Sequence, residues 1–193
     1  MVTQGVEGVS GEGVEADLVI VAYLLPLQNG YLPDRPPRWS DLDRLPLDRR
    51  RSVKEYEASA MIEADPFAIW AILTDASGYS HWDSGVERIE GTVAPGEKIK
   101  LHSEANPGRA FPVRVTEFAP PERMTWKGGM PLGLFKGVRT FSLSPQEAGV
   151  TRFYMREEYT GPLLPLIWRS MPDLGPSFEQ FASGLKARAQ RTR

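Results

Sequence analysis

The chain contains no cysteine among its 193 residues and only two histidines, His81 and His102. The absence of cysteine excludes disulfide bonds and thiol catalysis, and it is compatible with a reducing cytosol. Two histidines without a surrounding metal-binding motif are too few for a metal site. We therefore expect a cytoplasmic protein that carries neither a metal nor a cofactor.

The chain also has no large basic cluster and no long apolar run. The formal net charge is −2, and Arg49, Arg50 and Arg51 form only a short basic stretch beside Asp48. Nucleic acid is therefore not the expected partner. The apolar run over residues 18–25 is far shorter than the roughly 20 residues that a membrane span needs, and the acidic residues before it do not fit a signal peptide. We expect no integral membrane span.

The first 52 residues differ from the rest of the chain. They lack a clear hydrophobic period, and several prolines punctuate a charged stretch after residue 25. One interpretation is a poorly ordered extension or an overlong translated start. The alternative is a strand, built on the apolar run at 18–25, that adds to a sheet edge or to a partner. We expect an N-terminal extension over 1–52 and one folded domain over 53–193.

The strongest hydrophobic pattern lies over residues 163–191. Apolar residues recur there at steps of three and four, which places them on one side of a helix: Leu163, Ile167, Met171, Leu174, Phe178, Phe181 and Leu185. Pro172 and Pro176 interrupt the pattern and predict a break near 172–176. Ser177 with Gln180 has the spacing of a helix cap, in competition with Asp173 and Gly175. Such an apolar stripe must pack on a large surface.

Seven segments upstream of this helix have the pattern of strands. Alternating or short apolar runs, bounded by turn residues, predict strands over 54–62, 86–93, 98–104, 111–118, 123–128, 138–143 and 151–159. After the first strand, Asp65 and Pro66 mark the start of a short helix, and residues 75–82 predict a second helical turn. Short connections favour an antiparallel meander. Such a sheet curls around the terminal helix and leaves an internal cavity.

Several of these segments resemble a known family. The matching pieces are AMIEADPFAIWAILTDASGYSHWDSGVERIEG, PPERMTWKGG, LFKGVRTFSLSP, TRFYMREEYTG and the terminal helix. Together they cover roughly residues 53–191 and are similar to the START-like (SRPBCC, helix-grip) superfamily, which includes polyketide cyclases, lipid-transfer domains and the birch-pollen allergen group. The resemblance implies an α+β helix-grip fold, with a curved seven-stranded antiparallel sheet around a long C-terminal helix. It also implies a cavity for a hydrophobic ligand.

The candidate ligand-binding residues are apolar side chains that the pattern turns toward the concave face, together with the loop at residues 128–135. Apolar walls with few polar groups are typical of small-molecule cavities, although some of these side chains are equally compatible with a packed core. The candidates are Trp70, Tyr79, Trp82, Leu101, Val113, Trp126, Met130, Leu132, Phe135, Phe141, Met155, Phe178 and Phe181. The glycine-rich apolar loop has three interpretations: a lid or mouth, a subunit or membrane contact, or a buried core loop.

The candidate catalytic residues are Arg139, Glu157 and His81. Arg139 and Glu157 share strand parity with inward residues, so they can form a charged pair inside the cavity, where a buried charge needs a partner. The alternative, which we favour from the sequence, places both near the sheet end in water. His81 can act near neutral pH, but a capping or surface role is favoured. His102 is expected to point away from the concave face with the neighbouring lysines.

Three functions are compatible with these residues. The first is a non-enzymatic binder or carrier of a small hydrophobic molecule, such as a lipid, a polyketide or an aromatic compound. The second is a polyketide cyclase or dehydratase that uses the same cavity and a few polar groups. The third is a partner-binding module of the chaperone-activator type, with the apolar loop as its contact. The expected assembly is a monomer or a homodimer.

Overall fold

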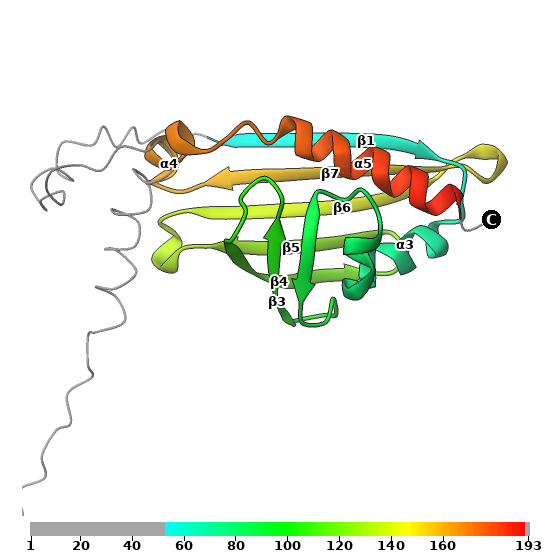
Figure 1. Cartoon of the computed structure of the whole chain (residues 1–193), viewed down its shortest axis with the longest axis horizontal. Coiled ribbons are helices and arrows are strands. Elements are labelled where there is room, and N and C mark those ends of the chain that lie inside the picture. The colour runs from blue at the N-terminus through cyan, green and yellow to red at the C-terminus, as the bar shows by residue number, and fades with distance from the viewer. Residues whose placement is uncertain (1–52, 192–193) are drawn as a thin grey trace, which may run out of the picture. The chain divides into compact units, whose positions relative to one another are not determined.

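Residues 53–191 of the chain are described by a computed structural model, and they form the predicted seven-stranded antiparallel sheet (Figure 1). The expected extension over 1–52, including its possible strand, lies outside the described residues. The strands are β1 (Lys54–Ile62), β2 (Val86–Glu90), β3 (Lys98–Ser103), β4 (Ala110–Ala119), β5 (Arg123–Gly129), β6 (Lys136–Pro145) and β7 (Thr151–Thr160).

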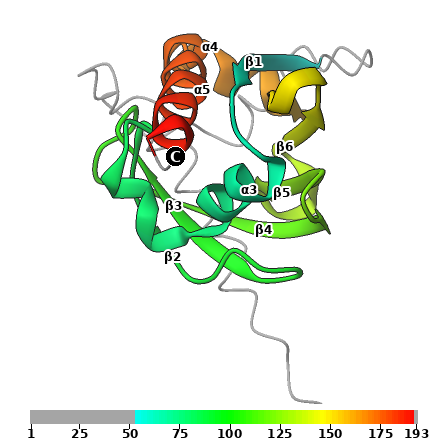
Figure 2. The same ribbon diagram turned by 90° about the vertical axis from the view of Figure 1, so that its right-hand side faces the viewer.

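The strand order is β1-β7-β6-β5-β4-β3-β2. Strands β2 to β7 therefore follow one another as the predicted meander. Strand β1 pairs with β7, so that Tyr56 lies opposite Glu157 and Ala58 opposite Met155. Figure 2 shows that the sheet curls around the last helix, as the helix-grip fold requires. The α+β fold expected from the sequence is confirmed.

Strand β2 is shorter than predicted. It ends at Glu90 instead of residue 93, because Gly91 has a φ of 101° and turns the chain out of the strand. A Cβ at Gly91 would also lie 3.0 Å from the carbonyl oxygen of Lys98, so the chain passes close to β3 at this point. Glycine is the residue that adopts such a conformation without strain.

The first helix begins where the sequence predicts. Helix α3 (Pro66–Thr74) has Asp65 as its N-cap, whose Oδ1 accepts a hydrogen bond of 2.8 Å from the backbone N–H of Phe67. The second helical turn is a 3-10 helix, η1 (Ala76–His81). Two further 3-10 turns, η2 (Pro131–Gly133) and η3 (Glu147–Gly149), lie in the β5–β6 and β6–β7 connections.

The predicted break in the C-terminal helix is confirmed. The chain forms α4 (Leu164–Ser170) and then α5 (Gly175–Gln190). None of the three competing cap residues is the N-cap, because α5 begins at Gly175 and its N-cap is Leu174. Asp173 lies next to it, and its Oδ1 accepts a hydrogen bond of 3.0 Å from the N–H of Gly175. Residues 166–171, which form most of α4, belong to a second compact unit, and the sheet with α5 belongs to the other.

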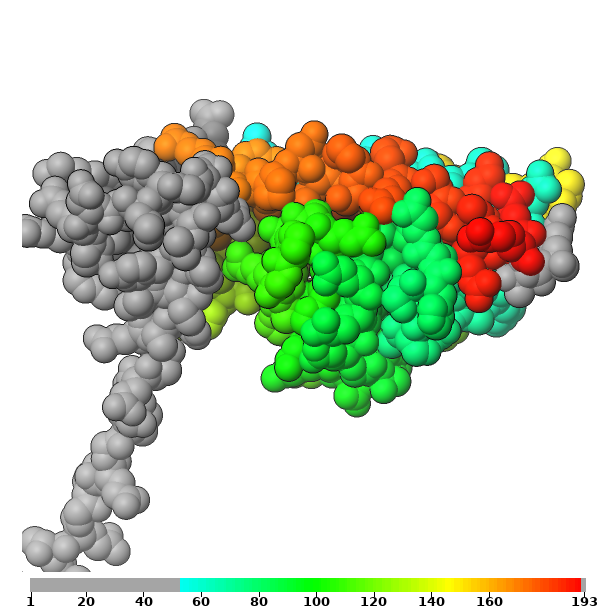
Figure 3. Space-filling model, in the orientation of Figure 1, coloured from blue at the N-terminus to red at the C-terminus, as the bar shows by residue number. Residues whose placement is uncertain are grey.

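Helix α5 packs on β1 and on the connection between η1 and β2. Its buried side includes Phe178, Phe181 and Leu185, each no more than 2% exposed. Gln180 Nε2 donates to Asp83 Oδ1 at 2.6 Å. A Cβ on Gly184 would lie only 1.8 Å from the carbonyl oxygen of Asp83, so the two backbones are in direct contact. Figure 3 shows α5, in orange to red, directly against the green segments.

None of the helices in residues 53–191 is both long and apolar enough to cross a membrane.

Candidate functional site

One end of the concave face is filled by a cluster of aromatic rings. Trp126 meets Phe141 at a centroid distance of 4.8 Å, and Tyr79 lies 5.5 Å from Trp82 and 6.2 Å from Phe181. The seven aromatic candidates from the strands and helices are at most 7% exposed: Trp70, Tyr79, Trp82, Trp126, Phe141, Phe178 and Phe181. The expected open cavity does not extend through this end, because rings from the sheet reach those of α5. Their role in ligand binding stays a prediction.

The charged pair predicted between Arg139 and Glu157 forms, and it lies inside. The two residues are direct cross-strand partners in β6 and β7. Arg139 Nε donates to Glu157 Oε2 at 2.7 Å, and its Nη2 lies 2.6 Å from the same oxygen. Their side chains are only 16% and 15% exposed. The favoured alternative, a solvated pair at the sheet end, is therefore wrong.

The ion pair points toward the first turn of α5. The guanidinium carbon of Arg139 lies 4.9 Å from the ring centroid of Phe178, a cation–π arrangement. Burial alone would lower the pKa of Arg139, but the adjacent Glu157 carboxylate outweighs this effect and the pKa is raised. Arg139 therefore stays charged at any physiological pH, and Glu157 is its counter-ion.

Three residues beside this pair were not identified from the sequence. Tyr159 is 5% exposed, and burial together with the negative charge of Glu157 raises its pKa. Tyr56 on β1 lies opposite Glu157, with its ring centroid 5.7 Å from that of Phe178. A Cβ at Gly137 would lie 3.0 Å from Glu157 Oε1, so the missing side chain gives the carboxylate its space. Tyr159 lies two residues after Glu157 on the same strand and therefore faces the same side of the sheet. This alternation would have identified Tyr159 as a candidate from the sequence.

Two buried indole N–H groups have no acceptor in the described part of the chain. They are Nε1 of Trp82 and Nε1 of Trp126. A buried donor without a partner costs about 1–3 kcal/mol, so such groups are rare and call for an explanation. Trp126 is the cross-strand partner of Arg139 between β5 and β6. A buried donor without an acceptor therefore belongs to the residue that lies opposite Arg139 in the sheet.

The apolar loop between β5 and β6 joins this region. Its base is closed by a hydrogen bond of 2.8 Å from Met130 N–H to the carbonyl of Phe135. Phe135 stacks on Tyr159 at a centroid distance of 5.8 Å. Leu132 at the tip is 89% exposed and has a φ of 57°, which is unfavourable for a leucine. The interpretation as a fully buried core loop is therefore wrong for the tip.

The remaining candidates are dispersed. Met155 is buried beside Ala58, Leu101 is 8% exposed, and Val113 is half-buried on β4. His81 is exposed at the end of η1, and its charge helps to lower the pKa of Asp75, after the hydrogen bond from Ser77. His102 shares the strand side of Lys98 and Lys100, but it is only 8% exposed, with Nε2 2.9 Å from Glu90 Oε1.

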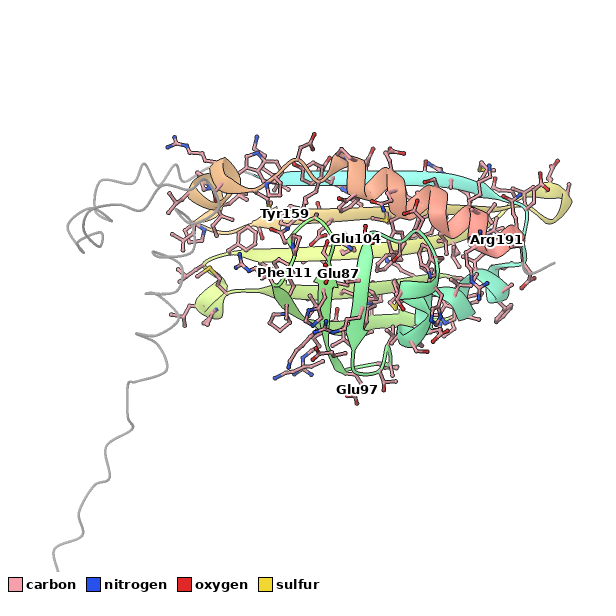
Figure 4. All side chains as sticks on the ribbon, viewed as in Figure 1. Glu87, Glu97, Glu104, Phe111, Tyr159 and Arg191 are labelled. Atoms are coloured by element: carbon pink, nitrogen blue, oxygen red, sulfur yellow. The ribbon has the colours of Figure 1, made fainter. Side chains whose placement is uncertain are left out.

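Figure 4 shows Tyr159 and Phe111 toward one end of the strands and Arg191 at the other. A surface pocket of about 540 Å³ lies near the second end. Its lining residues are Ala64, Asp65, Pro66, Ala68, Pro145, Gln146, Gly149, Val150, Thr151 and Ala189. Thr151 and Glu157 are six residues apart on β7, or about 20 Å at 3.3 Å per residue. The Asp65 carboxylate in its lining is already engaged as the N-cap of α3. We therefore do not consider this pocket a candidate for catalysis or specific ligand binding.

Within residues 53–191, no group of three or more His, Asp or Glu side chains is arranged to hold a metal ion.

Alkaline pH is expected to destabilise the protein through its buried tyrosines. Burial raises the pKa of Tyr79, whose hydroxyl donates to the carbonyl of Leu73 at 2.8 Å, and the pKa of Tyr159 is also raised. Above pH 10 the unfolded chain loses these protons while the folded chain retains them, so folding becomes less favourable by up to about 1.4 kcal/mol per pH unit for each tyrosine. Urea unfolding between pH 9 and 12 measures this slope.

The matched variant is Tyr79→Phe, which retains the ring and removes the proton. Its unfolding free energy is expected to fall less steeply above pH 10 than that of the unchanged protein. Identical slopes would mean that Tyr79 ionises equally in both states and is not buried as described.

Comparisons with known proteins agree with this architecture. The family described as "Polyketide cyclase / dehydrase and lipid transport" matches residues 54–190. No curated protein matches the chain by sequence. Among solved structures, a hypothetical protein from Helicobacter pylori is similar with a TM-score of 0.59 at 14% identity, over 82% of this chain and 99% of that one.

Two further solved structures have the same fold. The Zhui aromatase/cyclase from Streptomyces sp. R1128 has a TM-score of 0.57 at 13% identity, over 74% of this chain and 97% of that one. A START superfamily protein from Mycobacterium smegmatis has a TM-score of 0.52 at 16% identity, over 72% and 99% of the two chains. At these identities the likeness shows the fold alone.

Proposed function

Because the chain belongs to the polyketide cyclase / dehydrase and lipid transport family, we propose that it binds a small hydrophobic molecule beside the Arg139–Glu157 pair. The observation that carries this proposal is a mostly buried ion pair walled by aromatic rings. The side chains of Arg139 and Glu157 are 16% and 15% exposed, and Phe178, whose ring contacts the guanidinium, is 2% exposed. An apolar wall with a few convergent polar groups is typical of ligand sites.

The β5–β6 loop supports an entry route at this end of the sheet. Phe135 connects the loop to Tyr159 and hence to the neighbourhood of Glu157. The exposed tip at Leu132 is apolar and held in an unfavourable backbone conformation, and strained residues cluster at ligand clamps and gates. We propose that this loop forms the mouth of the site.

A soak with mixed lipids and aromatic compounds, followed by native mass spectrometry, tests the proposal. We expect one apolar molecule to remain bound per chain. Gly137→Val fills the space beside Glu157 Oε1 and should abolish retention, whereas Thr140→Val, on the opposite side of the same strand, should retain the ligand. The melting temperatures of both variants show whether a loss of retention results from unfolding of the variant. Equal retention by a folded Gly137→Val variant, or none by the unchanged chain, contradicts the proposal.

A second candidate is catalysis of the cyclase or dehydratase type at the same place. It is favoured by the position of Glu157, a carboxylate that adjoins the hydroxyl-bearing Tyr159 on the concave face. Glu157→Gln retains the shape and removes the basic group. Loss of turnover with retained binding would support an enzyme, and unchanged binding of a substrate that is never converted would support a carrier.

Replacement of Leu132 by aspartate is expected to weaken uptake of an apolar fluorescent dye several-fold without unfolding the protein. The Leu132 side chain is 89% exposed and contributes little to the core, so a charge at this position should leave the stability of the protein unchanged. It should instead hinder the entry of an apolar molecule through the proposed mouth. Dye fluorescence and the melting temperature are measured together. Phe67→Asp is the control, because Phe67 is 65% exposed on α3. If both variants weaken uptake equally, the loop is not the mouth.

A further inference from the structure

We infer that the site selects a flat apolar molecule that carries an uncharged carbonyl-type oxygen, and that it discriminates against a carboxylate of the same shape. This inference rests on the proposed function and adds the polar chemistry of the ligand to it. It is carried by the donors that Arg139 and Trp126 leave unused, and by the charge that Glu157 already supplies.

The guanidinium of Arg139 has donors to spare. An arginine side chain has five N–H groups in one plane. Nε donates a hydrogen bond to Oε2 of Glu157, and Nη2 forms an ion pair with the same oxygen. Among residues 53–191, Nη1 has no acceptor within hydrogen-bond distance, and the guanidinium carbon lies 4.9 Å from the centroid of the Phe178 ring. The Nη1 donor can therefore donate to a ligand oxygen.

The charge of the site favours a neutral oxygen. Arg139 and Glu157 cancel one another, and both side chains are less than one-fifth exposed. A ligand carboxylate would add an uncompensated negative charge next to Glu157, and burying such a charge is unfavourable unless it has a partner of its own. A ketone or amide oxygen accepts the same hydrogen bond without bringing a charge.

Trp126 provides an independent indication of a ligand acceptor. It is 2% exposed, its Nε1 donor has no acceptor in the described chain, and it lies opposite Arg139 in the sheet. Tyr56, Tyr159 and Phe178 supply apolar ring surfaces on the other side of the pair. The donors and rings together fit a flat body with one neutral oxygen.

Three naphthalenes of similar shape test this inference: 2-acetylnaphthalene, 2-naphthoate and 2-ethylnaphthalene. Their dissociation constants are measured by calorimetry at pH 7.5 with the full chain. The ketone is expected to bind about tenfold more tightly than the hydrocarbon, the effect of one hydrogen bond to a charged donor. The carboxylate is expected to bind at least tenfold more weakly than the ketone.

Two variants locate the effect. In the double variant Arg139→Met/Glu157→Leu, the ketone should lose its advantage while the hydrocarbon still binds. In Trp126→Phe, which removes the N–H and retains an aromatic ring, the advantage should fall several-fold. Near-UV circular dichroism reports whether each variant retains its tertiary structure.

The outcomes separate the inference from the proposed function. Equal binding of ketone and hydrocarbon, tightest binding of the carboxylate, or an undiminished ketone advantage in the double variant would overturn the inference and leave apolar binding intact. Failure of all three compounds to bind would overturn the inference, and the soak with mixed lipids and aromatic compounds then decides whether the proposed function fails as well.

Discussion

Replacement of Gly184 by alanine is expected to lower the free energy of unfolding by about 3 kcal/mol or more, because the added methyl group meets backbone instead of a movable side chain. The new Cβ would lie 1.8 Å from the carbonyl oxygen of Asp83 and 2.6 Å from its carbon. Helix α5 and the η1–β2 connection would have to move apart. At an ordinary exposed position inside a helix, replacement of glycine by alanine raises the free energy of unfolding by about 1 kcal/mol. A decrease in Gly184→Ala would therefore by itself indicate close contact between α5 and the Asp83 backbone.

The matched control for this variant is Ser183→Ala. Ser183 precedes Gly184 in α5, its side chain is exposed, and its hydroxyl only donates to the carbonyl of Gln180. Thermal unfolding should show a melting temperature lower by roughly 6–12 °C for Gly184→Ala, at about 2–4 °C per kcal/mol in a chain of this size, and little change for the control. If Gly184→Ala and Ser183→Ala have the same melting temperature, α5 does not contact the Asp83 backbone.

Replacement of Arg139 by methionine alone is expected to destabilise the protein by about 3–5 kcal/mol, the usual effect of leaving one member of a buried ion pair without its partner. Methionine retains the apolar part of the side chain, so the effect reports the unpaired Glu157 carboxylate. The double variant Arg139→Met/Glu157→Leu removes both charges and should recover most of the stability. Urea unfolding of the two variants measures the difference.

A surface ion pair serves as the control. Arg156 pairs with Glu55 and Glu158, and its side chain is 39% exposed. Exposed pairs contribute little because water screens them, so Arg156→Met should change stability only slightly. If Arg139→Met were equally mild, water would reach the inner pair freely and the site beside it would be open solvent.

The fold follows from the local sequence to a large extent. Alternating apolar residues predicted all seven strands, and Asp65 with Pro66 marked the start of α3 at the right residue. Pro172 and Pro176 predicted the break before α5. These signals depend only on neighbouring residues, because strand alternation, helix caps and proline effects act within a few positions.

The site was less predictable because it depends on contacts between distant segments. Parity showed that Arg139 and Glu157 face the same way, but not whether water reaches them. That depends on the aromatic ring that α5 places over the guanidinium. The pairing of β1 with β7, which sets Tyr56 opposite Glu157, has no local signal at all.

Whether the interior is hollow depends on distances that a hydrophobic pattern does not contain. The pattern placed Trp126, Phe141 and Phe181 on facing surfaces, and the curvature of the sheet decides whether their rings touch. They do, with centroids 4.8 Å apart for Trp126 and Phe141 and 5.8 Å apart for Phe141 and Phe181. The expected hollow therefore does not extend between these rings.

The pairing of β1 with β7 also has a consequence for synthesis of the protein. Glu55 and Arg156, which bond across these strands, are separated by 101 positions in the chain. A ribosome adds about 5–20 residues per second, so β1 waits roughly 5–20 s before its neighbour exists. During that interval its backbone donors and acceptors are available to other nascent chains. The charged residues Glu55 and Glu57 alternate with the inward Tyr56 and Ala58, an arrangement that discourages such pairing until translation reaches β7.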